Sequence, residues 1–205
     1  MARIDDYINA KKLVMAELSK QTLSSISKKS GYTEIMDTNS LKIPFLNRVY
    51  EVSYPEFEFM DSKDSTKEIP LQEQVLILHY LAADNYLKSK SRWVAYREIP
   101  GAAFYFGAFV KRAIDPLKKV FGANSKGLKK AAELLYGKPV DNGDSAFEFQ
   151  ILPNVPLQLI IWEGDEDFDP EANILFDESV AKLLSPEDCA WLAGMLVYRL
   201  IALAF

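Results

Sequence analysis

The sequence contains few of the residues on which most metal and redox sites depend. Its 205 residues include one cysteine, Cys189, and one histidine, His79. A single cysteine excludes an internal disulfide, a cysteine-rich zinc site and a cysteine-ligated iron–sulfur cluster within this chain. A Ser–His–Asp triad would have to use His79, and the chain lacks the Gly-x-Ser-x-Gly turn that carries such a serine. Serine hydrolysis is therefore not expected.

Basic charge is not in excess. The chain has 24 Lys and Arg residues against 29 Asp and Glu residues, which gives a formal net charge of -5. Because a general nucleic-acid-binding domain is basic as a whole, we expect no nucleic-acid partner. The glycines have neither the P-loop spacing nor the dinucleotide-binding spacing, so the sequence predicts no loop that cradles a phosphate.

Long apolar runs are also scarce. The longest covers residues 189–205, is interrupted by Gly194 and Arg199, and is shorter than the roughly 20 residues that span a bilayer. The preceding Ser-Pro-Glu-Asp at 185–188 is typical of a helix start. We therefore expect an apolar C-terminal core helix at about 186–205 and no membrane span. The first six residues lack an apolar signal segment, which predicts a cytoplasmic location.

The rest of the chain alternates between helical and extended patterns. The segment at about 71–87 is apolar on nearly every side, which predicts a buried central helix. The absence of regular βαβ alternation favours an α+β fold, with a mainly antiparallel sheet packed by several helices. We expect a single domain, 1–205, with a helix and hairpin region at 1–69 as a candidate peripheral lobe. Strands are predicted at 41–45, 49–54, 146–151, 156–162 and 174–176.

Several short motifs carry a resemblance to a known family. They are Ile77–Leu81, Trp93 with Tyr96–Gly101, Gly143–Phe147, Trp162 with Gly164–Phe168, and Ile174–Asp177. In these motifs the chain resembles the bacterial and archaeal family called domain of unknown function 3786. The resemblance implies anaerobic metabolism as the setting but no agreed activity. Some relatives carry an added cysteine-rich iron–sulfur segment, which a chain with one cysteine lacks.

An acidic segment follows the strand predicted at 156–162. Residues 163–171 contain six carboxylates and no basic residue. Three aspartates have the alternate spacing that opens a calcium loop, but Pro170 stands where that motif needs glycine and Phe176 where it needs glutamate. A solvated turn is the favoured interpretation, with partner docking and divalent-cation binding as alternatives. The metal candidates are Asp165, Asp167 and Asp169, and the docking candidates are Glu163 and Glu166.

A basic segment lies earlier in the chain. Residues 111–130 contain seven basic residues and one acidic residue. Such a run is most often the solvated face of helices, and the alternative is contact with a phosphate or an acidic partner. The docking candidates in this segment are Lys118, Lys119, Lys129 and Lys130.

Single residues supply the remaining candidates for a ligand site. His79 is predicted to be buried and structural, with axial ligation of a haem or corrinoid as the alternative. Arg97 is predicted to pair with an acid such as Asp144 or Asp165, and the alternative is that it clamps a carboxylate or phosphate. The ligand-binding candidates are therefore His79, Arg97, Asp144 and Asp165.

Three functions are compatible with this inventory. The favoured one is a non-catalytic binding or accessory protein that acts with a partner or cofactor protein in anaerobic metabolism. The alternatives are a haem- or corrinoid-binding protein that uses His79, and a carboxylate enzyme, with or without a divalent cation. The candidates for the enzyme are Asp144, Asp165, Asp167 and Asp177. Convergence of Asp144 and Asp165 in one concave pocket would favour the enzyme, whereas scattered, exposed carboxylates would favour the binding protein.

Overall fold

The computed structural model describes residues 4–84 and 92–205. Its helices and antiparallel sheets confirm the predicted α+β class. The chain divides into two compact units, Met1–Lys88 with Lys182–Leu184, and Ser89–Ala181 with Ser185–Phe205. The single domain inferred from the sequence, with 1–69 as a lobe, stays a prediction.

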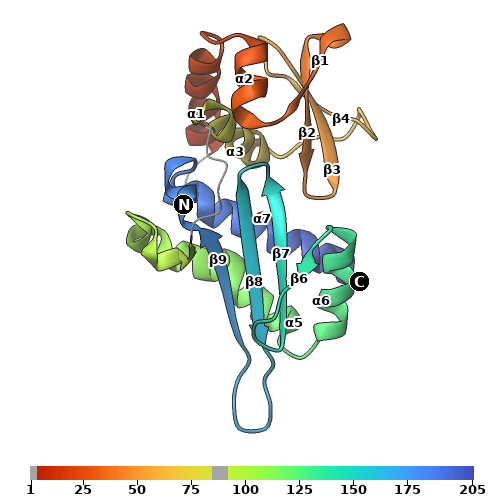
Figure 1. The fold of residues 1–205 in the computed structure, drawn as a ribbon, viewed down its shortest axis with the longest axis vertical. Coiled ribbons are helices and arrows are strands. Elements are labelled where there is room, and N and C mark those ends of the chain that lie inside the picture. Colours follow the sequence, from red (N-terminus) through yellow and green to blue (C-terminus); the bar gives the residue numbers. More distant parts are fainter. Residues whose placement is uncertain (1–3, 85–91) are drawn as a thin grey trace. The chain divides into compact units, whose positions relative to one another are not determined.

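The first unit combines three helices with a four-stranded antiparallel sheet in the order β1-β2-β3-β4 (Figure 1). The predicted hairpin is confirmed, with Ile43 opposite Tyr50 and both side chains buried. The outer strands β1 and β4 are too short to show alternation in the sequence. The elements are α1 (Ile4–Leu18), α2 (Leu23–Ser30), β1 (Thr33–Ile35), η1 (Met36–Thr38), β2 (Ser40–Phe45), β3 (Arg48–Ser53), β4 (Phe59–Asp61) and α3 (Leu71–Ala82).

Helix α3 is the buried helix that the sequence predicts, but it ends earlier than expected. Ala83 is extended and donates its N–H to the carbonyl of His79, so the helix stops at Ala82. The part of the expected helix at 85–87 lies outside the described residues. His79 is half-buried, which corrects the expectation of a buried side chain, because it lies in the last turn of the helix, where Ala82 and Ala83 are also only partly covered.

The second unit is built on a five-stranded antiparallel sheet in the order β5-β9-β8-β7-β6. Its central strand β8 is buried along nearly its whole length, which explains the continuous apolar run in the sequence. The elements are β5 (Trp93–Ala95), η2 (Tyr96–Glu98), η3 (Ala102–Tyr105), α4 (Phe106–Phe109), η4 (Val110–Ile114), α5 (Asp115–Phe121), α6 (Ser125–Leu134), β6 (Lys138–Pro139), β7 (Ser145–Leu152), β8 (Val155–Trp162), β9 (Glu171–Asp177), η5 (Glu178–Lys182) and α7 (Pro186–Ala204).

The C-terminal helix α7 confirms the predicted core helix. The Ser185 hydroxyl accepts the N–H of Asp188 at 3.1 Å, and the Asp188 carboxylate accepts the N–H of Ser185 at 3.2 Å. This reciprocal capping fixes the start of the helix. Gly194, which interrupts the apolar run, lies close to Arg112 of the π-helical turn η4. A Cβ at this position would lie 3.3 Å from the Arg112 Cβ. Within 4–84 and 92–205, no helix is long and apolar enough to cross a bilayer.

Candidate functional site

A concavity of the second unit lies where helix α5 ends beside the β8–β9 loop. This loop, residues 163–170, extends beyond the ends of the neighbouring strands (Figure 1). The hollow measures about 630 Å³, within the range of sites that hold small molecules or short peptide segments. The residues that line it are Asp115, Lys118, Lys119, Gly122, Ala123, Gly164, Asp165, Phe168, Asp169 and Pro170.

Two glycines allow the loop to lie directly against the end of α5. The N–H of Gly164 donates to the carbonyl of Gly122 at 3.1 Å. A Cβ at Gly122 would lie 2.5 Å from the Cβ of Pro170, and a Cβ at Gly164 would lie 2.7 Å from the Pro170 Cδ. We call this contact between the end of α5 and the β8–β9 loop the seam. Because real Cβ atoms do not approach so closely, only glycine fits at the two positions without movement of the chain.

The tip of the loop is shaped by Asp165. One carboxylate oxygen, Oδ1, accepts the N–H groups of Asp167 at 2.8 Å and Phe168 at 2.9 Å, and the Asp165 N–H donates to the Phe168 carbonyl. This turn holds the Phe168 ring outward, with 74% of the residue exposed. The loop therefore presents an aromatic ring surrounded by carboxylates.

The hollow brings together two segments that stand out in the sequence for opposite charge. Lys118 and Lys119 come from the basic segment, and Asp165 and Asp169 come from the acidic one. Asp115, one helical turn before the lysines, adds a third carboxylate. The site can therefore bind groups of both signs beside the apolar surfaces of Phe168 and Pro170.

The other docking candidates lie outside the lining of this hollow. Glu163 and Glu166 are exposed on the same loop, and Lys129 and Lys130 are exposed on α6. Their role in docking stays a prediction.

Asp144 and Asp165 do not converge on one pocket. Asp144 is exposed just before β7, and its Oδ2 accepts the N–H of Glu163 at 2.8 Å. It thereby anchors the base of the β8–β9 loop, whereas Asp165 lines the hollow near the tip. The two carboxylates serve different parts of one loop.

Metal-ligating side chains are dispersed over residues 4–84 and 92–205. Among the described residues, no three His, Cys, Asp or Glu side chains are gathered to hold a metal ion. Cation binding by Asp165, Asp167 and Asp169 stays a prediction, with Asp165 and Asp169 as the two that line the hollow. Burial raises the pKa of the Cys189 thiol, so the reactive thiolate is disfavoured.

Arg97 stacks on an aromatic ring. Its guanidinium carbon lies 3.7 Å from the centroid of the Phe106 ring. The expected ion pair with Asp144 or Asp165 is not found among the described contacts. The side chain is exposed, and the stacking holds it in place as a cation–π contact does. Binding of a carboxylate or phosphate by Arg97 stays a prediction, as does haem or corrinoid ligation by His79.

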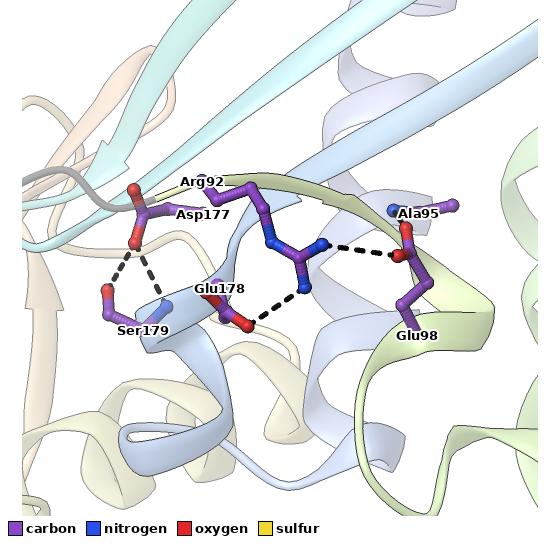
Figure 2. Close-up of polar contacts among 6 residues, drawn as sticks. All are labelled: Arg92, Ala95, Glu98, Asp177, Glu178 and Ser179. Atoms are coloured by element: carbon purple, nitrogen blue, oxygen red, sulfur yellow. Dashed lines mark hydrogen bonds and ion pairs between the residues drawn. The ribbon is translucent and has the colours of Figure 1, made fainter.

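A neighbouring polar cluster secures the paired ends of β5 and β9 (Figure 2). Arg92, which the sequence did not single out, lies between two carboxylates, at 3.0 Å from Glu178 and 3.9 Å from Glu98. The buried Asp177 accepts the N–H and hydroxyl of Ser179, at 2.9 and 2.5 Å. These bonds give Asp177 a structural role at the strand end. Glu98 also accepts the N–H of Ala95 at 2.7 Å.

A comparison with protein families decides the relationship that the motifs suggest. The family described as domain of unknown function DUF3786 matches residues 22–199, most of the chain. The chain belongs to this family. The DUF3786 match extends through both compact units and includes α5 and the β8–β9 loop. Neither the curated proteins nor the solved structures provide a match.

Two features of the hollow are not indicated by the sequence pattern. They are the exposed ring of Phe168 and the contact between Gly122 and Pro170. The local pattern contains no sign that Gly122 contacts Pro170, because the two residues are far apart in the chain. The acidic composition marks the loop, and the lysine run marks the helix, that together line the hollow.

Proposed function

We propose that this DUF3786 protein is a non-catalytic binding protein that acts as an accessory to a partner protein. It docks through the hollow beside α5, with Phe168 as its apolar anchor. The observation that carries the proposal is the separation of Asp144 and Asp165 combined with a hollow that presents both charges and an exposed ring. The proposed setting is anaerobic metabolism, which the family resemblance implies, and the proposed associate is a partner or cofactor protein.

The physical argument rests on how protein interfaces gain affinity. A few large side chains, aromatic rings above all, contribute most of the binding free energy when the partner buries them. Charged groups around them contribute little individually but steer association and orient the partner. Phe168 surrounded by carboxylates and flanked by Lys118 and Lys119 has this composition.

Site-specific photo-crosslinking tests the proposal. A photoreactive phenylalanine analogue is placed at position 168 in native cells, and covalent adducts are identified by mass spectrometry. The matched control is position 104, because Phe104 is 87% exposed elsewhere in the same unit. We expect one identified partner at position 168 and not at 104. Identical adducts at both positions, or none at 168, would count against docking.

The purified partner then provides a quantitative test. Loss of an anchoring ring typically weakens binding by about tenfold or more. Phe168→Ser should therefore raise the Kd by this amount, and Phe104→Ser should leave it unchanged. A catalytic function would be favoured instead if Asp165→Asn abolished a turnover of the partner's substrate without changing the Kd.

A further inference from the structure

We infer that the partner segment bound in the hollow is extended and carries an acidic and a basic side chain at adjacent positions. The inference rests on the proposed docking function and specifies the chemistry of its partner. Its starting point is that the two sides of the hollow differ in charge. Helix α5 contributes Lys118 and Lys119 with Asp115, and the loop contributes Asp165 and Asp169.

The helix side is net positive and the loop side net negative. Asp115 is three and four residues before the two lysines, so it lies on the same helix face and offsets one of their charges. On the loop, Asp165 commits Oδ1 to two backbone N–H groups, which leaves Oδ2 and the Asp169 carboxylate for a ligand. A ligand of one sign would be attracted to one side and repelled by the other.

A partner segment with both signs meets both sides at once. Side chains at successive positions of an extended chain point in opposite directions, and positions two apart point the same way. An acidic residue directed at Lys118 and Lys119 therefore places its immediate neighbour towards Asp165 and Asp169. Acid and base must be one or three positions apart, and not two.

The apolar part of the lining sets the remaining requirement. Phe168, Pro170 and Ala123 provide apolar surface next to both charged groups. An apolar side chain beside the acid–base pair would cover this surface and remove it from water. The favoured segment is therefore a short extended stretch with adjacent opposite charges and one flanking apolar residue.

Selection from a phage-displayed random heptapeptide library, panned against the full-length protein, tests this chemistry. We expect enriched peptides to carry an acidic and a basic residue one or three positions apart, with a neighbouring apolar residue. The double variant Lys118→Glu/Lys119→Glu should weaken the enriched peptides by about tenfold or more, because attraction becomes repulsion. The matched control, Lys63→Glu/Lys67→Glu, makes the same charge change at two exposed lysines before α3 in the first unit and should leave binding unchanged.

The outcomes separate the inference from the proposed function. Peptides that bind the Lys118→Glu/Lys119→Glu variant more weakly, but in which acid and base are not one or three positions apart, would overturn the inference and leave docking at the hollow intact. Peptides affected equally by both double variants, or no enrichment above background, would overturn both. Circular dichroism and the Tm of each variant establish that a loss of binding is not a loss of folding.

Discussion

At the scale of single residues, two buried tyrosines in the first unit differ in one hydrogen bond. The rings of Tyr32 and Tyr80 meet edge to face with centroids 5.9 Å apart. The Tyr80 hydroxyl donates to the Ser30 carbonyl at 2.9 Å, whereas the Tyr32 hydroxyl is buried and has no hydrogen-bond partner in the described part of the chain. A buried polar group without a partner lowers stability.

Removing the Tyr32 hydroxyl should therefore stabilise the folded protein. We expect Tyr32→Phe to raise the free energy of unfolding by about 1 kcal/mol, and the matched change Tyr80→Phe to lower it by about the same amount. Urea denaturation measures both. A Tyr32→Phe variant less stable than Tyr80→Phe would contradict this reading of the pair.

His79 is the second residue with a testable role. Because it is half-buried on α3, we expect His79→Leu to fold and to lie within roughly 3 kcal/mol of wild type, the cost of losing a satisfied polar group. Urea denaturation again provides the measurement. An absorbance band of haem or corrinoid in the purified protein that shifts in His79→Leu would instead make His79 a ligand.

At the scale of elements, the hollow depends on the seam between α5 and the β8–β9 loop. Gly122→Ala would place a Cβ 2.5 Å from Pro170, and overpacking of this kind costs about 1–3 kcal/mol. Gly107 in α4 is the matched control, because a Cβ there meets nothing within 4 Å. Gly107→Ala should stabilise the helix by about 0.5–1 kcal/mol. Chemical denaturation of the two variants checks the difference, and equal stabilities would argue against the seam.

Divalent cations should not stabilise the protein through the acidic loop. Asp165 already uses one oxygen within the loop, and Pro170 breaks the calcium-loop pattern. A real site at a hundredfold excess of cation over its Kd would add about 2.7 kcal/mol. We expect calcium or magnesium chloride to change the Tm no more than sodium chloride at equal ionic strength. A specific rise that Asp167→Asn abolishes would show the opposite.

Local signals made some elements predictable and left others hidden. Helix α7 follows from a cap and a first-turn proline that are contiguous in sequence, and the β7–β8 hairpin follows from apolar patterning on both sides of a turn. The end of α3 could not be placed, because the apolar pattern continues past Ala82. The hollow was hidden for a different reason: it exists only where Gly122, Gly164 and Pro170 meet.

At the scale of the whole molecule, several buried groups share a preference for the protonated state. Burial raises the pKa values of Tyr32, Tyr50, Tyr96 and Cys189. A hydrogen bond and the charge of Glu73 add to the rise at Tyr50, whose hydroxyl donates to that carboxylate at 2.5 Å. In the unfolded chain these groups lose protons near pH 8.5 for cysteine and about 10 for tyrosine.

The protein should therefore lose stability in alkaline solution. Because the folded pKa values are higher, the unfolded state releases its protons first as the pH rises, and this release favours unfolding. The contribution is fully present below about pH 8.5 and declines above it. Urea denaturation between pH 7 and 11 should show this decline, and Tyr96→Phe should reduce its slope. A flat profile would contradict it.

The path of the chain between the two units has a consequence for inheritance. Residues 182–184 group with the first unit although residues on both sides of them group with the second, and Leu183 and Leu184 are buried. A recombination event that carried residues 92–205 into another gene would separate these leucines from the residues with which they group. The two units are therefore interleaved along the chain, and no single cut in the gene divides one from the other.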